Sequence, residues 1–311
     1  IRRGPLAPPE SATEVFDVST RNASEPAYTS GFPVDFALAR AKNIANNWDT
    51  GSRLQQGRRM FTNLTNAEAS NSNMMFDYQD GWSAGTGAST EYLSWMWKRA
   101  PGFFDVVAYT GDGTAGRTVS HNLGVAPEMM WVKSRDQARN WEVYHSGIAS
   151  DAETDSINLN QRYAAQDNAN FWDDTKPTSS VFSLGIGTNY SSEDFIAYLF
   201  ASLSGVSKIG SYTGNGTNQT IDCGFSSGAR FILIKRSDQG SGVIAAGDWH
   251  VFDTERGVVA GNDPYLELNT TNAEVTSEDA VDPHNSGFIV NEVSGSNINT
   301  SGNTYIFYAI A

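Results

Sequence analysis

Two stretches of this chain, about a hundred residues apart, share the pattern Tyr-Thr-Gly-Asp/Asn-Gly-Thr. Residues 106–114 read Val-Val-Ala-Tyr-Thr-Gly-Asp-Gly-Thr, and residues 209–217 read Ile-Gly-Ser-Tyr-Thr-Gly-Asn-Gly-Thr. In both, a strand-like segment ends at a tyrosine and runs into Asp-Gly or Asn-Gly, which supply the positive φ angles of tight hairpins. Self-similarity at a fixed spacing indicates tandem copies of one structural unit. These stretches therefore predict a β-rich fold built from repeats.

The likeness between the two copies continues beyond the turn. Each has a glycine, an apolar strand that ends in a basic residue, a tryptophan and a closing strand rich in aromatic residues. The matching elements are Gly124 and Gly224, residues 129–136 and 231–238, in which the apolar strand runs into a basic residue and an aspartate, Trp141 and Trp249, and residues 195–200 and 305–310. About six extra residues, at 240–246, precede Trp249. Loops tolerate such differences in length.

A more diverged copy precedes these two. Trp48 follows Arg40 by eight residues, as Trp141 follows Lys133, and residues 92–97 match the closing strand. The predicted organisation is a proline-containing extended N-terminal arm at residues 1–14, repeat one at 15–101, repeat two at 102–204 and repeat three at 205–311.

The closing strand of repeat two indicates how each repeat is layered. Alternate residues of 195–200 lie on opposite faces of a strand, and both faces are apolar, which predicts a central strand covered on both sides. Residues 34–47 are rich in alanine, but their counterparts in the other repeats have β patterns, so we expect a strand there as well. Short strands separated by frequent turns favour an all-β fold of three tandem β-sandwich modules, jelly-roll or Ig-like.

Composition excludes several classes of partner. The net charge of −14 and the pI of about 4.6 disfavour binding to nucleic acid and to anionic membranes. The chain has no run of 18 apolar residues, so we expect no membrane insertion. Its single cysteine, Cys223, cannot form an intramolecular disulfide and is interpreted as a small buried apolar residue.

The sequence contains no recognisable catalytic or metal-binding pattern. It lacks a Gly-x-Ser-x-Gly nucleophile elbow. The four histidines, His121, His145, His250 and His284, do not form pairs with metal-ligand spacing, and we interpret them as partly exposed strand or loop residues. We therefore predict no enzyme activity, no metal and no cofactor.

Aromatic and acidic residues in loops are the candidates for ligand binding. Trp82 and Trp172 have no counterpart in the other repeats and are predicted to lie in surface loops, where Asp173 and Asp174 beside Trp172 would complete a sugar or calcium site. The alternative is that the two aspartates are solvated loop residues. In contrast, Trp48, Trp141 and Trp249 recur at equivalent positions, which indicates core packing.

The order of motifs in repeat two resembles a repeated domain of tailed-bacteriophage virion structural proteins, notably tail-fibre-like proteins of marine and cyanobacterial phages. The motifs that carry the resemblance are residues 109–114, the segment 117–127 that contains His-Asn-Leu-Gly, Lys133, Asp136 and residues 141–145. The resemblance is close over residues 90–202 and weaker over 205–311. It implies a particle part and transfers no active site.

The function expected from this resemblance is that of a virion structural protein. A tail fibre or appendage would act in particle architecture and host-surface attachment, on the virion or outside the cell. Its partners would be other virion proteins, further copies of the chain in a homo-oligomer such as a trimer, and a host-surface glycan. The alternatives are a capsid-surface decoration protein and a lectin-like glycan-binding protein. A secreted polysaccharide-degrading enzyme is disfavoured because the catalytic constellation is missing.

Overall fold

The computed structural model describes residues 7–238, 247–292 and 295–311. Their regular structure consists of antiparallel β-sheets and four short 3-10 turns, which confirms the predicted all-β class. The turns are η1 (Ala12–Glu14), η2 (Arg53–Gln55), η3 (Ala152–Thr154) and η4 (Ile186–Thr188).

Each repeat contributes one large antiparallel sheet, and the strand order across it recurs. In repeat one it is β1 (Phe16–Arg21), β9 (Ser89–Trp97), β3 (Phe36–Ala41), β4 (Asp49–Ser52), β5 (Arg58–Phe61) and β6 (Ala69–Ser70). In repeat two it is β10 (Phe104–Thr110), β17 (Asp194–Phe200), β12 (Met129–Ser134), β13 (Glu142–His145), β14 (Asp155–Asn158) and β15 (Gln166–Asp167). In repeat three it is β18 (Ser207–Thr213), β25 (Thr304–Ile310), β20 (Phe231–Arg236), β21 (Trp249–Asp253) and β22 (Leu266–Glu267).

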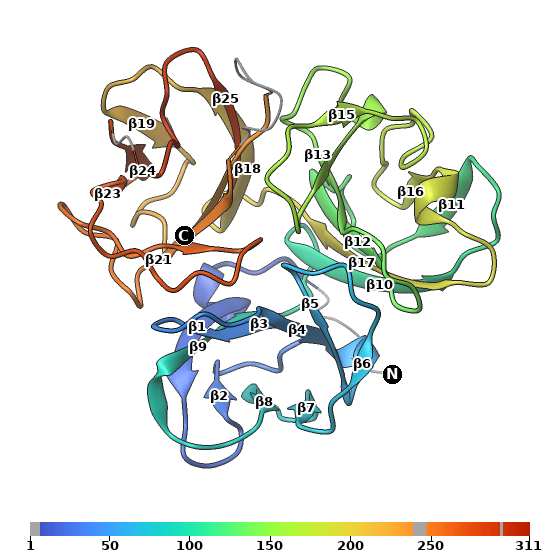
Figure 1. Ribbon diagram of the computed structural model, residues 1–311, viewed down its shortest axis with the longest axis horizontal. Coiled ribbons are helices and arrows are strands. Elements are labelled where there is room, and N and C mark those ends of the chain that lie inside the picture. The colour runs from blue at the N-terminus through green and yellow to red at the C-terminus, as the bar shows by residue number, and fades with distance from the viewer. Residues whose placement is uncertain (1–6, 239–246, 293–294) are drawn as a thin grey trace.

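Each repeat also has a small antiparallel sheet, placed toward the outside of the molecule (Figure 1). In repeat one it contains β2 (Tyr28–Thr29), β8 (Gly81–Ala84) and β7 (Met74–Met75). In repeat two it contains β11 (Arg117–Ser120) and β16 (Val181–Leu184). In repeat three it contains β19 (Gln219–Asp222), β24 (Gly287–Val290) and β23 (Val281–His284).

The closing strand of each repeat is covered on both faces, as predicted. In β17, the even-numbered Ile196, Tyr198 and Phe200 belong to a core cluster shared by the three repeats. The odd-numbered Phe195, Ala197 and Leu199 pack with the small sheet of repeat two. The strand lies between β10 and β12, so its backbone is hydrogen-bonded on both edges.

The inner faces of the three large sheets meet in this shared core at the middle of the molecule (Figure 1). Aromatic rings join every pair of repeats, and their centroid distances are 4.2 Å for Phe36–Tyr198, 5.3 Å for Phe16–Phe231 and 5.3 Å for Phe200–Tyr308. Because such rings bury large apolar areas, the shared core stabilises the three repeats as one body.

Tryptophan side chains connect the repeats in a closed cycle. The three indole Nε1–H bonds run to a backbone carbonyl of another repeat: Trp48 to Glu267 at 2.8 Å, Trp141 to Phe61 at 2.9 Å and Trp249 to Asn158 at 3.0 Å. In each repeat an asparagine side chain accepts the backbone N–H of the tryptophan: Asn63, Asn160 and Asn269. The predicted core role of these tryptophans is confirmed, since all three are buried.

Backbone hydrogen bonds close the same cycle a second time. The bonds are Glu68 N–H to Arg135 O at 2.7 Å, Ala165 N–H to Ser237 O at 2.9 Å and Glu274 N–H to Lys42 O at 2.7 Å. Repeat one donates to repeat two, two to three, and three to one. The described contacts therefore have pseudo-threefold symmetry, with each interface built from equivalent positions.

A buried cation ends the middle strand of each large sheet. Arg40, Lys133 and Lys235 are at most 1% exposed and donate to backbone carbonyls. The Arg40 guanidinium reaches Asn272 O of repeat three at 2.7 Å, and Lys235 Nζ reaches Arg162 O of repeat two at 3.1 Å. Carbonyl groups thus compensate part of the cost of burying these charges.

Three sequence-based predictions concern the alanine-rich segment 34–47, the N-terminal arm and the inserted segment of repeat three. Residues 36–41 form β3, so the strand predicted within 34–47 is confirmed. Residues 1–6 of the predicted arm and the inserted segment 240–246 lie outside the described residues. The rest of the arm does not simply extend, because Ala12–Glu14 forms η1 and Ala12 packs in the shared core.

The interpretation of the histidines as partly exposed is wrong for His121, His145 and His250, which are buried. His145 lies at the interface with repeat three, where its Nε2 is 3.2 Å from Phe307 O and its Nδ1 accepts the Gly147 N–H at 3.0 Å. Burial lowers the pKa of both His145 and His250 to about 4. Cys223 is buried, as expected.

We predict that Trp48→Phe, Trp141→Phe and Trp249→Phe each lower the free energy of unfolding by about 0.5–1.5 kcal/mol through loss of the indole hydrogen bond to the neighbouring repeat. The measurement is urea unfolding followed by circular dichroism. Trp131→Phe is the matched control, since Trp131 is equally buried and its indole N–H has no partner within the described residues. An equal loss in the control would show that volume, not the hydrogen bond, matters.

We predict that His145 makes the protein less stable as the pH falls from about 6.5 to 4. The unfolded histidine binds a proton near its ordinary pKa of 6.5 and the folded one only near 4, so protons favour the unfolded chain in this window. His145→Gln cannot titrate, and the difference in unfolding free energy between the wild type and this variant should shrink on acidification. A difference that is constant from pH 7 to 4.5 would contradict this.

Candidate functional site

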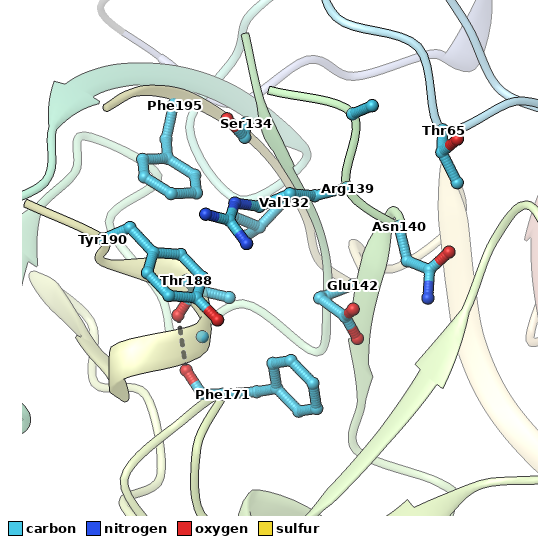
Figure 2. A pocket seen from close by; sticks show the side chains of 12 residues that line it. Thr65, Val132, Ser134, Arg139, Asn140, Glu142, Phe171, Thr188, Tyr190 and Phe195 are labelled. Carbon is cyan, nitrogen blue, oxygen red and sulfur yellow. Dashed lines mark hydrogen bonds between the residues drawn. The ribbon is translucent and has the colours of Figure 1, made fainter. Parts of the chain in front are cut away.

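A cleft of about 340 Å³ opens beside the large sheet of repeat two. Its floor is formed by Val132 of β12 and Phe195 of β17, and Glu142 of β13 lies at one side. Phe171 and Tyr190 come from the segments on either side of β16 and η4 (Figure 2). The cleft is thus built from parts of the chain that are far apart in sequence, in the range of volumes typical of ligand sites.

Close backbone packing holds Phe171 in place. The Phe171 carbonyl accepts the Gly185 N–H at 2.8 Å and the Thr188 hydroxyl at 2.6 Å. The Phe171 ring lies directly over Gly187, where a Cβ would approach the ring carbons to 2.9 Å. Gly187 therefore gives the ring its position at the wall of the cleft.

An ion pair with an aromatic partner forms the opposite wall. Arg139 makes two hydrogen bonds to Glu193, one of them from Nε at 2.8 Å, and its guanidinium carbon lies 3.5 Å from the centroid of the Tyr190 ring. Ser134 donates to the same carboxylate at 3.0 Å. These hydrogen bonds raise the pKa of Arg139 and lower that of Glu193, so both groups are charged at neutral pH and their charges offset each other.

Glu142 lies in the cleft without a basic partner among the described residues. Its Oε2 accepts hydrogen bonds from Ser156 Oγ and Asn158 Nδ2, both at 2.9 Å. Burial of the carboxyl raises its pKa to about 7, although these two hydrogen bonds act in the opposite direction. Near neutral pH this carboxyl group can therefore donate as well as accept a hydrogen bond.

Asn140 stands beside Glu142 at the mouth of the cleft (Figure 2). Its Oδ1 accepts from Asn160 Nδ2 at 3.0 Å and Gln161 Nε2 at 3.2 Å, so the side chain is fixed and its amide nitrogen is the remaining donor. Thr65 of repeat one reaches the rim. The cleft thus combines amide, carboxyl and hydroxyl groups with three aromatic rings, which suits a small polar ligand.

The residue that follows the tryptophan differs between repeats. Repeat one has Asp49, paired with Arg59 at 3.1 Å. Repeat three has His250, which is buried and lies 5.1 Å from the Tyr265 ring between centroids. Only repeat two places an unpaired carboxyl here, within the described residues.

The structure does not support the sequence-based choice of Trp82 and Trp172 as exposed loop residues. Trp82 lies in β8, fully buried between Tyr28 and Phe76, and donates to Ser94 Oγ at 2.8 Å. Trp172 is 1% exposed and donates to Asp155 O at 2.9 Å. Both indoles fill the space between a large sheet and the segments that cover it, so neither ring offers a face to a ligand.

The predicted aspartates form a turn. Asp173 and Asp174 have φ angles of 54° and 46°, a left-handed conformation that Asp tolerates better than most residues. Trp82 lies in repeat one, so the structure does not bring the four predicted residues together. In the described part of the chain, no three or more His, Cys, Asp or Glu side chains are arranged to hold a metal.

Sequence reasoning missed Arg139, Glu142 and Tyr190. The available signal was the divergence of one position, where the three repeats have Asp49, Glu142 and His250 directly after the recurring tryptophan. When a residue differs between repeats while the tryptophan before it recurs, the contacts between repeats do not require a particular side chain at that position.

Fold and cleft together define an all-β protein of three cyclically joined repeats with a ligand-sized cleft in the second. The chain belongs to the family described as Domain of unknown function (DUF7483), whose model matches residues 13–311. This match spans all three repeats. Comparison with the curated proteins and with the solved structures found no match. No helix in the described residues has the length and apolar character needed to cross a membrane.

We predict that Glu142→Gln stabilises the protein at pH 8 by about 1–3 kcal/mol. The folded carboxyl has its pKa at about 7 and the unfolded one at its ordinary 4.5, so the wild type loses stability as the pH rises through this window. The uncharged amide avoids this loss and still offers an oxygen to Ser156 and Asn158. The gain, measured by urea unfolding, should shrink toward pH 4.5; a gain independent of pH would contradict the assignment.

Proposed function

We propose that this chain is a virion structural protein of a tailed bacteriophage, a tail fibre or appendage that acts in particle architecture and host-surface attachment. In this proposal each pair of one large and one small sheet is a β-sandwich module. The observation that carries the structural role is the closed cycle of equivalent inter-repeat contacts around one aromatic core.

A virion component that acts outside the cell must be stable through its own contacts, because no cellular chaperone refolds it there. This chain has one cysteine, so no internal disulfide is available and packing must supply the rigidity. Three interfaces, each with an indole bond and a backbone bond, meet this need. The net charge of −14 favours solubility of a β-rich body that would otherwise self-associate.

The cycle also bears on how copies would assemble. The contacts that a homotrimer makes between chains are made here between repeats of a single chain. Assembly with further copies, or with other virion proteins, would therefore use the outer surface of the molecule, leaving the shared core intact.

The alternatives are a capsid-surface decoration protein and a lectin-like glycan-binding protein. The cleft of repeat two favours the glycan-binding one, because it supplies aromatic rings and fixed polar groups in a ligand-sized space. Attachment through a glycan is compatible with a place on a particle, so the two roles can belong to one protein.

The experiment that tests the structural role is immunogold labelling of purified phage particles that carry the gene, with antibody raised against this chain. We expect label on the tail. Label on the head would favour the decoration protein, and label only in the particle-free fraction would contradict a virion role. Light scattering of the isolated chain gives its oligomeric state alongside.

A further inference from the structure

We propose that the cleft of repeat two binds a neutral saccharide unit of a surface glycan. Glu142 and Asn140 hydrogen-bond its hydroxyl groups, and Phe171 and Tyr190 pack against its ring. The biological purpose of this binding rests on the proposed attachment function, whereas the binding itself rests on the geometry of the cleft.

The chemistry of the lining matches a sugar. A pyranose has an apolar face of C–H groups and an equatorial rim of hydroxyls that both donate and accept. Phe171 and Tyr190 provide aromatic surface for the first, and the Asn140 amide and the Glu142 carboxyl provide donors and acceptors for the second. A purely apolar ligand would leave the remaining donor, the Asn140 amide nitrogen, without a partner.

The charges in the cleft select against anions and cations. Arg139 is already neutralised by Glu193, so it offers no uncompensated positive charge to a carboxylate or phosphate. The protein's net charge of −14 adds a repulsive field. For a cation, the cleft offers only the Glu142 carboxyl outside the Arg139–Glu193 pair, and the raised pKa of that group keeps it partly protonated near neutral pH.

The site is pre-organised, which lowers the entropy cost of binding. Ser156 and Asn158 fix the Glu142 carboxyl, and Asn160 and Gln161 fix the Asn140 amide. Gly187 positions the Phe171 ring. A volume of about 340 Å³ lies at the lower end of ligand sites, which suits one or two sugar rings.

Repeat two alone should carry the site. The position of Glu142 is occupied in repeat one by Asp49, which pairs with Arg59, and in repeat three by the buried His250. Within the described residues the comparison of this position gives one such site per chain, and avidity would come from several chains on a particle.

The test uses the full chain on an array of neutral hexose and N-acetylhexosamine oligosaccharides beside sialylated and sulfated ones, followed by calorimetry with the best neutral binder. We expect binding to neutral oligosaccharides that Glu142→Leu and Phe171→Ala each weaken at least tenfold. Asp49→Asn is the matched control, because it changes the equivalent position of repeat one outside the cleft, and it should bind like the wild type.

Three results would overturn the proposal: retention of no neutral oligosaccharide, binding of the anionic set alone, or equal weakening by Asp49→Asn. Urea unfolding of each variant shows whether a loss of binding reflects a loss of folding. Failure here with gold label on particles leaves the structural role standing. Saccharide binding by a chain that is missing from particles would instead overturn the virion role and keep the site.

Discussion

The hydrogen bond from a buried indole to the backbone of the preceding repeat in the cycle is the constraint on which this structure depends. Trp48, Trp141 and Trp249 each need a partner for a buried N–H, and none satisfies it within its own repeat. The large sheets must therefore face one another closely enough to share a core. When they do, the inner faces of the large sheets are buried against one another. The small sheets then need to cover only the outer faces.

The position of the cleft depends on these contacts between repeats. Two of its walls come from connecting segments, but the sheet fixes the side formed by Glu142, which is in register on β13, directly after the tryptophan that joins two repeats. A binding group next to a rigid element is held more accurately than one on a free loop. Divergence at this position changes the chemistry without disturbing the interface.

Much of the fold could be predicted from the sequence because its signals are local. The repeated Tyr-Thr-Gly turn, the alternation in residues 195–200 and the recurring tryptophans indicate strands, a two-sided sheet and core residues. The cyclic closure could not be predicted, because each bond joins residues far apart in sequence and only one partner, the tryptophan, has a visible pattern. The prediction that Trp82 and Trp172 lie in surface loops is wrong for a similar reason: lack of repetition does not indicate exposure, since each indole is buried in a space that belongs to one repeat. The cleft depends on Phe171, Glu142 and Tyr190 meeting, which no spacing indicates.

The three interfaces are equivalent, but only two of them are accompanied by a peptide link. Repeats one and two, and two and three, are joined covalently, while repeats three and one meet through non-covalent contacts alone, and the same indole and backbone bonds form there. The peptide links between repeats therefore keep the repeats close together but do not determine the geometry of their interfaces. An ancestor of one repeat could form the same body from three separate chains, and two gene fusions would convert that assembly into this one. Fusion would also free each copy to change independently, which a symmetric assembly of identical chains cannot do.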